Sequence, residues 1–251
     1  MVCAVSVYDE AFLRYTDQSS RHAARAIASL LREPLAITSV LDIGCARGTW
    51  LSEWAALGAV DIQGVDGDYV ARDRLAIPVE RFRAHDLARP LGLGRRYDLV
   101  QSLEVAEHIP AAASDIFVAN LCVHASGLVL FSAAPPGQGG EHHVNEQPYD
   151  YWRAKFRVHG YHAHDCIRPR VADDPAISYW YRYNAFLYVR ADRCASLPVA
   201  IAATRIADHA PLPDLAPGLF RLRRQLVRLL PPPLRDGIAR LKARVAPSGR
   251  W

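Results

Sequence analysis

Apolar residues along the chain alternate between short continuous runs and runs with helical spacing. The continuous runs predict five strands, at Ser39–Ile43, Asp61–Val65, Glu80–Ala84, Tyr97–Ser102 and Gly127–Ser132. Apolar positions at intervals of three and four predict one or two helices within residues 9–32, and further helices at Thr49–Leu57 and Ala111–His124. Alternating strands and helices are typical of βαβ units, whose parallel strands form one sheet.

Two more strands are expected near the end of this region, at Tyr161–Ile167 and Ala185–Arg190. The segment between them is too short for a comfortable crossover helix, so they are expected to pair as a hairpin with an inserted loop. The pattern therefore predicts an α/β fold. Its seven-stranded sheet is mostly parallel with an antiparallel last strand, and helices cover both faces.

Charge and composition divide the chain into three parts. Residues 1–195 hold the predicted α/β domain with its N-terminal helices, and residues 196–217 are rich in Ala, Pro and Asp, which is typical of a linker. Residues 218–251 contain nine basic residues and one acid. The overall charge is +4, and this segment carries +8, so residues 1–217 carry −4. A mildly acidic body disfavours a nucleic-acid partner.

The basic segment 218–251 repeats Leu, Val and Ile with Arg and is broken by Pro231–Pro233, which predicts two short amphipathic helices. We weigh three roles for this appendage: a solvated extension, a contact in a homo-oligomer, or attachment to an anionic membrane or polyanion. The chain has neither an export signal nor an apolar run long enough to span a bilayer, so we expect a cytoplasmic protein. Its five scattered cysteines indicate neither disulfides nor a thiolate zinc site.

The segment 40–50 is an apolar strand that runs into a glycine-spaced turn and then a helix. Gly44 and Gly48 let a ligand approach the backbone, and the start of the helix offers unpaired N–H donors. Asp66 ends the second predicted strand, where a carboxylate can accept both hydroxyls of a ribose. Asp86 follows the third predicted strand. These features together predict a nucleotide-type ligand at one edge of the sheet.

This series resembles the class I S-adenosylmethionine-dependent methyltransferases over about residues 38–190. The resemblance implies a Rossmann-like fold with S-adenosylmethionine as cofactor. It assigns the methionine part to Asp42 and the glycine turn, the ribose to Asp66, and the adenine amine to Asp86. The full implied cofactor set is Asp42, Gly44, Cys45, Ala46, Gly48, Asp66, Asp86, Leu87 and Ser102. Ala46 departs from the family, where many members carry glycine.

A second group of polar residues follows the fourth predicted strand, in the sequence Glu104-Val-Ala-Glu107-His108. On a helical turn these three side chains would share one face, and the two carboxylates would repel each other unless a cation compensated. The loop 133–147 after the fifth strand borders the same cleft in this fold, and His142 or His143 from it can complete the group. A divalent metal site is therefore expected here.

This ExxEH pattern followed by a histidine is similar to the metal site of the ubiquinone-pathway O-methyltransferases and the small-RNA 2′-O-methyltransferases. The resemblance implies the metal ligands Glu104, Glu107, His108 and His143, with magnesium or manganese favoured by the oxygen ligands. His143, His142 and His108 are the candidate catalytic residues. Two alternatives stay open: metal-free chemistry with a histidine base, and an ordinary helix start in which acids favour the positive end of the dipole.

The expected activity is transfer of a methyl group to a hydroxyl of a carbohydrate or another polyhydroxylated small molecule. Alternatives are a catechol or quinol acceptor methylated without metal by a histidine base, RNA 2′-O-methylation, and a silent cofactor-binding partner. Trp152 and Phe156 are similar to positions in methyltransferases of sugars and polymers. An aromatic set is expected either at the acceptor entrance or in the core, and it comprises Tyr149, Tyr151, Tyr179, Trp180, Tyr181 and Tyr183.

Overall fold

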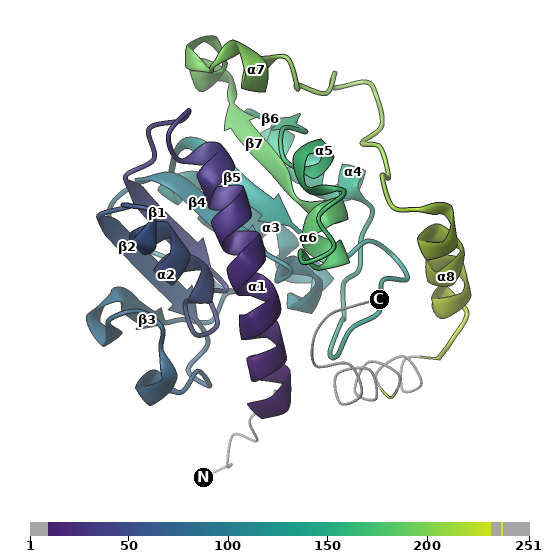
Figure 1. Cartoon of the computed structure of the whole chain (residues 1–251), viewed down its shortest axis with the longest axis horizontal. Helices are drawn as coiled ribbons and strands as arrows, with labels where there is room; N and C mark the ends of the chain where they lie inside the picture. The colour runs from purple at the N-terminus through teal and green to yellow at the C-terminus, as the bar shows by residue number, and fades with distance from the viewer. Residues whose placement is uncertain (1–9, 232–236, 238–251) are drawn as a thin grey trace.

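The computed structural model describes residues 10–231 and residue 237, and its centre is a seven-stranded sheet (Figure 1). The strands are β1 (Ser39–Ile43), β2 (Asp61–Asp66), β3 (Phe82–Ala84), β4 (Tyr97–Leu103), β5 (Ala125–Ser132), β6 (Tyr161–His164) and β7 (Phe186–Arg190). Their order is β3-β2-β1-β4-β5-β7-β6. Strands β1 to β5 are parallel, and β7 is antiparallel to both of its neighbours. The predicted sheet, with its late hairpin, is confirmed.

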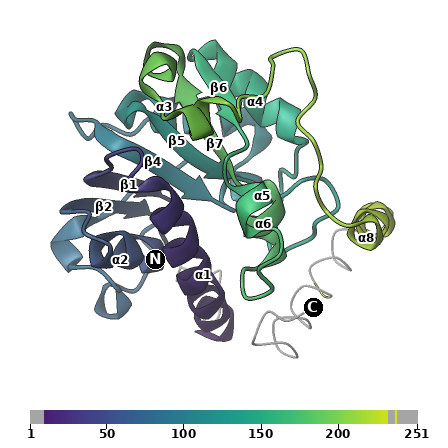
Figure 2. The same cartoon turned by 45° about the horizontal axis from the view of Figure 1, so that its top comes forward.

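Helices cover both faces of this sheet (Figures 1 and 2). They are α1 (Glu10–Leu31), α2 (Thr49–Ala56), α3 (Ser114–His124), α4 (Tyr149–Val158), α5 (Arg168–Val171), α6 (Tyr179–Asn184), α7 (Val199–Ala202) and α8 (Gly218–Arg228). Successive strand residues point to opposite faces. Leu99 thus packs in one core with Trp54 of α2, and Val100 in the other with Phe117 of α3. None of the described helices is long and apolar enough to cross a membrane.

Helix α4 is an element that the strand and helix patterns did not predict. Its buried residues Tyr149, Trp152, Arg153 and Phe156 recur at intervals of three and four, which is a readable helical signal. For its tyrosines the sequence left two places open, the acceptor entrance and the core. The two halves of the late hairpin are joined by α5 and α6, because the inserted loop folds back onto the sheet.

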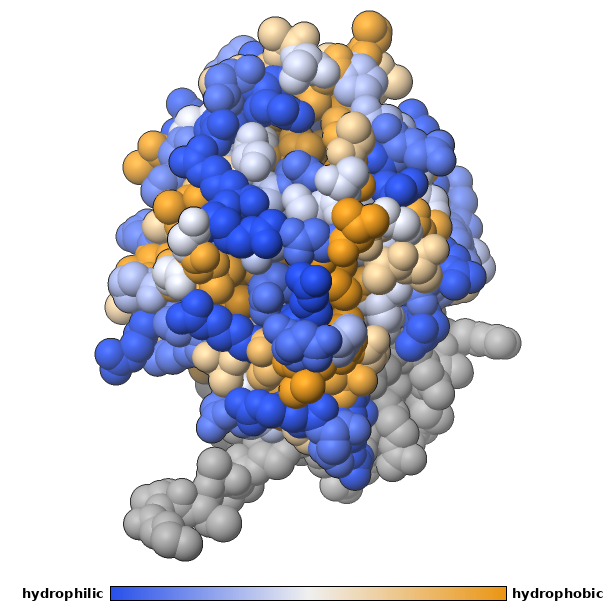
Figure 3. Space-filling model, turned by 90° about the vertical axis from the view of Figure 1, so that its left-hand side faces the viewer, coloured by the Kyte–Doolittle hydropathy of each residue, from blue (hydrophilic) through white to orange (hydrophobic). Residues whose placement is uncertain are grey.

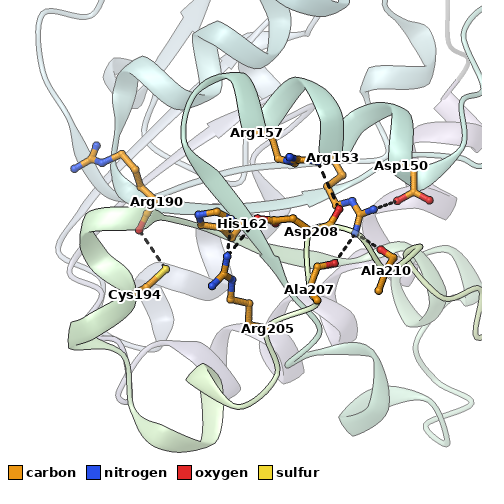
Figure 4. A network of polar contacts seen from close by, with 10 residues as sticks. All are labelled: Asp150, Arg153, Arg157, His162, Arg190, Cys194, Arg205, Ala207, Asp208 and Ala210. Carbon is orange, nitrogen blue, oxygen red and sulfur yellow. Dashed lines mark hydrogen bonds and ion pairs between the residues drawn. The ribbon is translucent and has the colours of Figure 1, made fainter.

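The segment 196–217, expected to be a linker, is attached to the body along much of its length. Residues 204–206 pair with the edge strand β6: Ile206 N–H donates to the Ala163 carbonyl over 2.9 Å. Arg153 of α4 donates to the carbonyls of Ala207 and Ala210, as Figure 4 shows. Composition could not reveal these contacts, because most of the partners are backbone groups that every residue carries.

The starts of β1 and β4 are held together by one carboxylate. Asp98 Oδ2 accepts hydrogen bonds from the Thr38 and Ser39 amides, both over 2.9 Å, and from the Thr38 hydroxyl over 2.8 Å. Burial alone would raise the pKa of Asp98, but these donors outweigh it and lower the pKa below its usual value. The bonds hold the two central strands in register at the end opposite the candidate site.

We expect Asp98→Ala to lower the free energy of unfolding by about 1–2 kcal/mol, because three donors lose their acceptor. A carboxyl with a lowered folded-state pKa stabilises the fold at neutral pH, and this contribution is lost as the pH falls through that pKa. Urea titrations at neutral and acidic pH should therefore show a difference that shrinks on acidification. Asp73→Ala, at an exposed acid in the turn Arg72–Arg74, is the control. A difference that stays constant with pH would contradict this account.

Candidate active site

The turn after β1 depends on two glycines. Gly44 has φ +90°, and a Cβ placed on it would lie 2.4 Å from a methyl carbon of Val105. Gly48 has φ +79° at the start of α2, and a Cβ there would lie 2.8 Å from Ile77. L side chains rarely adopt such φ values, so the spacing of the two glycines reflects both conformation and space. The turn therefore carries no side chain at these two positions, at the carboxyl edge of the sheet.

Ala46 also has a positive φ, +46°, although it is not glycine. This conformation costs an alanine on the order of 1–2 kcal/mol. Its amide donates to Asp66 Oδ2 over 2.6 Å, and a hydrogen bond to a carboxylate offsets part of that cost. The position where the family often has glycine thus keeps the conformation that glycine favours.

Asp66 lies at the end of β2 and is buried. Besides Ala46 N–H, its carboxylate accepts Gly67 N–H over 2.6 Å and the Tyr69 hydroxyl over 2.5 Å. Burial raises the pKa of Asp66, and these donors partly counter the effect. The carboxylate is oriented by the same turn that would surround the methionine part of a cofactor.

The other predicted cofactor residues follow the neighbouring strands. Asp86, just after β3, is exposed and pairs with Arg89 over 3.1 Å, while Leu87 beside it is buried. Ser102 in β4 is fully buried, and its Oγ has no hydrogen-bond partner in the described part of the chain. Strands β1 to β4 are parallel, so these residues lie along one edge, and their cofactor roles stay predictions.

Asp42 of β1 lies beneath the glycine turn in a chain of buried polar groups. The Gln101 side chain of β4 donates through Nε2 to Asp42 Oδ2 over 2.9 Å, and its Oε1 accepts the Trp54 indole N–H over 2.8 Å. Burial raises the pKa of Asp42 to about 7; the Gln101 bond lowers it and the nearby Asp66 raises it. Asp42 can therefore change protonation near neutral pH.

The helical turn expected across the ExxEH sequence does not form. Glu104 has φ +56°, and only Ala106–His108 form a short 3-10 helix. The amide of Glu104 still bonds to Ser132 of the adjacent strand, over 3.1 Å to its carbonyl and 3.0 Å to its hydroxyl. The chain must turn sharply directly after β4, so the prediction that one helical face carries all three side chains is wrong.

Glu104 is held by two carboxamides. Gln138 Nε2 donates to its Oε2 over 2.7 Å, and Asn184 Nδ2 donates to its Oε1 over 3.1 Å. Asn184 also bonds Gln138 and accepts the Tyr149 hydroxyl, both over 2.8 Å. Burial raises the pKa of Glu104 despite these donors. Loop 133–147 and α6 thus fix this carboxylate from two sides.

Three of the predicted site residues come together: Glu107, His108 and His143. Among the residues that the structure describes, only these three form a possible metal-binding group, with one ligand atom from each within 4.8 Å of the others. Glu107 is fully buried, and neither of its carboxylate oxygens has a hydrogen-bond partner within the described chain. Burial, and then the charge of Glu104, raise the pKa of Glu107 well above its usual value, and the nearby backbone N–H groups of Glu107 and Ala134 counter this only in part. Glu104 lies outside this group, so its role as a ligand stays a prediction.

Hydrogen bonds orient both imidazoles of this group. His143 Nδ1 lies 2.8 Å from Oε1 of Glu146, a carboxylate whose pKa is lowered by His143 and by two glycine amides against the effect of burial. His108 Nδ1 lies 3.3 Å from the His142 carbonyl. Both partners can only accept, so each Nδ1 carries a proton and donates it. Burial lowers the pKa of His108 to about 3, which keeps this ring neutral.

The loop is fixed to the end of β4 by the Glu107 backbone. Its carbonyl accepts the amides of both Val144 and Asn145, each over 2.9 Å. This anchoring brings the His143 ring to a centroid distance of 4.8 Å from that of His108. The other loop histidine, His142, is exposed, and its Nε2 lies 3.7 Å from Oε1 of Glu141. The geometry therefore favours His143 over His142.

Of the two places expected for the aromatic set, the acceptor entrance and the core, the structure favours the core for most members. Tyr149 and Tyr181 are buried, and Tyr181 bonds Ser20 through its hydroxyl over 2.9 Å. Tyr179 of α6 instead packs on Phe220 of α8, with ring centroids 4.8 Å apart.

The sequence did not predict four polar residues that shape the site: Gln101, Gln138, Asn184 and Glu146. The i, i+3 spacing of His143 and Glu146 was a readable signal, whereas the amides act across long sequence separations.

Comparison with known proteins places this site in context. The sequence model of a family described as a methyltransferase domain matches residues 13–165. The ubiquinone biosynthesis O-methyltransferase of Methylobacterium sp. (strain 4-46) is 34% identical over 119 residues, which cover 45% of this chain and 46% of that protein. A protein of the same name from Pseudomonas syringae pv. tomato is 32% identical over 110 residues, or 40% of this chain and 46% of its own. The match spans about half the length of these relatives.

Solved structures share the fold at low identity. DesVI from Streptomyces venezuelae has a TM-score of 0.53 and 15% identity, covering 69% of this chain and 93% of that protein. Magnesium protoporphyrin IX methyltransferase from Synechocystis PCC 6803, with bound S-adenosylmethionine, has a TM-score of 0.50 and 21% identity. The match covers 69% of this chain and 80% of that protein. At these identities the similarity concerns the architecture alone.

We expect the affinity for S-adenosylmethionine to increase as the pH rises from about 5.5 to 7.5. The cofactor is cationic, so it favours ionised Asp42, whose pKa is about 7 in the free protein; binding then releases a proton and is weaker at low pH. Calorimetry across this range measures the trend. Asp42→Asn should bind less tightly and lose most of the slope, and an unchanged slope in that variant would assign the titration to another group.

Proposed function

This chain belongs to the class I S-adenosylmethionine-dependent methyltransferases, and from that premise we propose that it methylates a hydroxyl oxygen of a small acceptor with the help of a divalent cation. The observation that supports the proposal is the buried Glu107 carboxylate, which has no hydrogen-bond partner among the described residues and lies beside the imidazoles of His108 and His143. A buried carboxylate without a partner is costly, and a cation compensates that cost.

The donor set fits such a cation. Glu107, His108 and His143 would hold it, with Glu146 and the His142 carbonyl orienting the rings as partners behind the ligands. One carboxylate with two imidazoles suits manganese, iron, cobalt or zinc better than magnesium, which prefers oxygen ligands. When bound, the ion would supply Lewis acidity that lowers the pKa of an acceptor hydroxyl.

His143 is the residue best placed to manage a proton if it is not a ligand. Its Nε2 lone pair can accept the proton of an acceptor hydroxyl, and Glu146 on Nδ1 would stabilise the resulting imidazolium. One lone pair cannot serve a metal and a proton at the same time, so these two roles are alternatives. The acceptor oxygen then attacks the methyl carbon in line with its bond to sulfur. The carbon–oxygen bond forms as the carbon–sulfur bond breaks, and S-adenosylhomocysteine leaves as a neutral thioether; where His143 is a ligand, the hydroxyl proton passes to water. The protein contributes mainly through positioning.

For the acceptor we propose a small molecule with neighbouring hydroxyls, of the carbohydrate or polyol type. The depth of the Glu107 carboxylate and the neutral His108 ring beside it suit an uncharged polar group more than a phosphate backbone. A quinol or catechol is the second candidate, and the specific observation that favours it is the 34% identity to a protein named ubiquinone biosynthesis O-methyltransferase.

Calorimetric titration of chelator-treated protein with Mn²⁺ tests this function. We expect one site per chain, and Glu107→Gln should weaken it by more than about 100-fold because the central carboxylate is removed. S-adenosylmethionine binding by the same variant should persist, since Glu107 lies outside the cofactor turn. Chelator should also abolish methyl transfer in a panel of vicinal diols, sugars and catechols, and added Mn²⁺ should restore it.

Glu141→Gln is the matched control, because it removes a nearby carboxylate outside the three-residue group. Cofactor binding without any Mn²⁺ signal, together with chelator-resistant turnover that is lost in His143→Ala, would replace the cation by histidine-base chemistry. Cofactor binding with no turnover on the whole panel would favour a silent cofactor-binding partner instead.

A further inference from the structure

Helix α8 presents two different stripes of side chains. The first consists of Phe220, Arg223, Arg224 and Val227, which are partly buried. The second consists of leucines at intervals of three and four: Leu219, Leu222, Leu226 and Leu229, which are 83%, 52%, 58% and 80% exposed. Side chains at this spacing line one side of a helix. We call these four residues the leucine stripe.

The first stripe attaches α8 to the loop that carries the candidate site. The Arg223 guanidinium donates to the Gln138 carbonyl over 3.2 Å, and Arg224 forms an ion pair with Asp214. At Gly137 a Cβ would lie 2.1 Å from the Arg224 carbonyl oxygen, so helix and loop are in direct contact. Figure 1 shows α8 at the periphery of the molecule, beyond α6. This attachment leaves the leucine stripe facing outward.

The charge of α8 is of one sign. Between Gly218 and Arg228 it carries four arginines and no acid, and Arg221 and Arg228 are exposed. A helix with an apolar stripe bordered by arginines is typical of elements that lie in the interface of an anionic bilayer. By contrast, hydrophobic residues on the face beside β3 are interspersed with hydrophilic ones (Figure 3).

We propose that the leucine stripe is a docking surface for an anionic lipid bilayer, with the leucines entering the headgroup boundary and the exposed Arg221 and Arg228 contacting lipid phosphates. Charge complementarity supports this occupant, since each basic side chain near the surface strengthens binding to anionic lipid. A second copy of the chain fits less well. Three leucines on a helix of 11 residues, with Leu229 directly after its end, cover much less than the roughly 800 Å² per partner of a stable interface, and the arginines of two copies would repel each other.

Docking through α8 would bring the loop after β5 close to the bilayer surface. A hydroxyl acceptor that partitions into the lipid interface could then reach the site without leaving the membrane. This consequence rests on the proposed function, whereas docking itself does not.

Sedimentation of the full chain with lipid vesicles tests the docking surface. We expect binding to vesicles of phosphatidylcholine and phosphatidylglycerol at a ratio of about 2 to 1, weaker binding at higher salt, and little binding to phosphatidylcholine alone. The double variant Leu222→Glu/Leu226→Glu should bind the anionic vesicles at least about tenfold less tightly. The readout needs neither cofactor nor acceptor, so its failure and that of the proposed function are distinguishable.

Val60→Glu/Val158→Glu is the matched control, because it makes the same change at two exposed apolar residues outside α8, which are 81% and 83% exposed. It should bind vesicles nearly as well as the wild type, and both double variants should keep the wild-type melting temperature and cofactor affinity. Equal binding by the two double variants, or equal binding to neutral and anionic vesicles, would overturn the proposal. A wild-type dimer that dissociates in the leucine variant would assign the stripe to a second copy.

Discussion

Three buried carboxylates, Asp42, Asp66 and Glu107, and the partly buried Glu104 lie along one edge of the sheet, and desolvation raises the pKa of each. Parallel pairing of β1, β2 and β4 makes this arrangement unavoidable, since the carboxyl ends of these strands meet at one edge. Hydrogen-bond donors compensate the burial of these carboxylates to different degrees. Asp66 has backbone donors and Glu104 has two amides, whereas Glu107 has no partner in the described chain. The edge is therefore suited to cationic ligands, and the methylsulfonium cofactor is one of them.

The loop after β5 connects the parts of the molecule that a reaction would need. Its Gln138 side chain bonds Glu104, while its Gln138 carbonyl accepts from Arg223 of α8. Further along, Val144 and Asn145 fix it to the Glu107 carbonyl and so place His143 beside His108. A change in the position of α8 would thus reach the site through one short segment, by direct contacts.

Local patterns predicted most of the architecture. The strand Ser39–Ile43 and the start of α2 at Thr49 agree with the structure, because a buried parallel strand is a continuous apolar run and a glycine turn ends it. Boundaries shifted where 3-10 turns intervene, as at Val79–Arg81 before β3. The second amphipathic helix predicted beyond Pro231–Pro233 lies outside the described residues. The first is observed as α8.

Local spacing was enough to predict the fold class, the glycine turn with its acids, and the residue types at the candidate site. Which of those residues meet depends on how the loops fold against the sheet. The tertiary structure separated Glu104 from Glu107 by a left-handed turn and selected His143 over His142. It also brought Asn184, which lies 80 positions further along the chain, into hydrogen-bond contact with Glu104. Such choices depend on where loops are anchored by backbone hydrogen bonds, and those bonds leave no signature in side-chain identity.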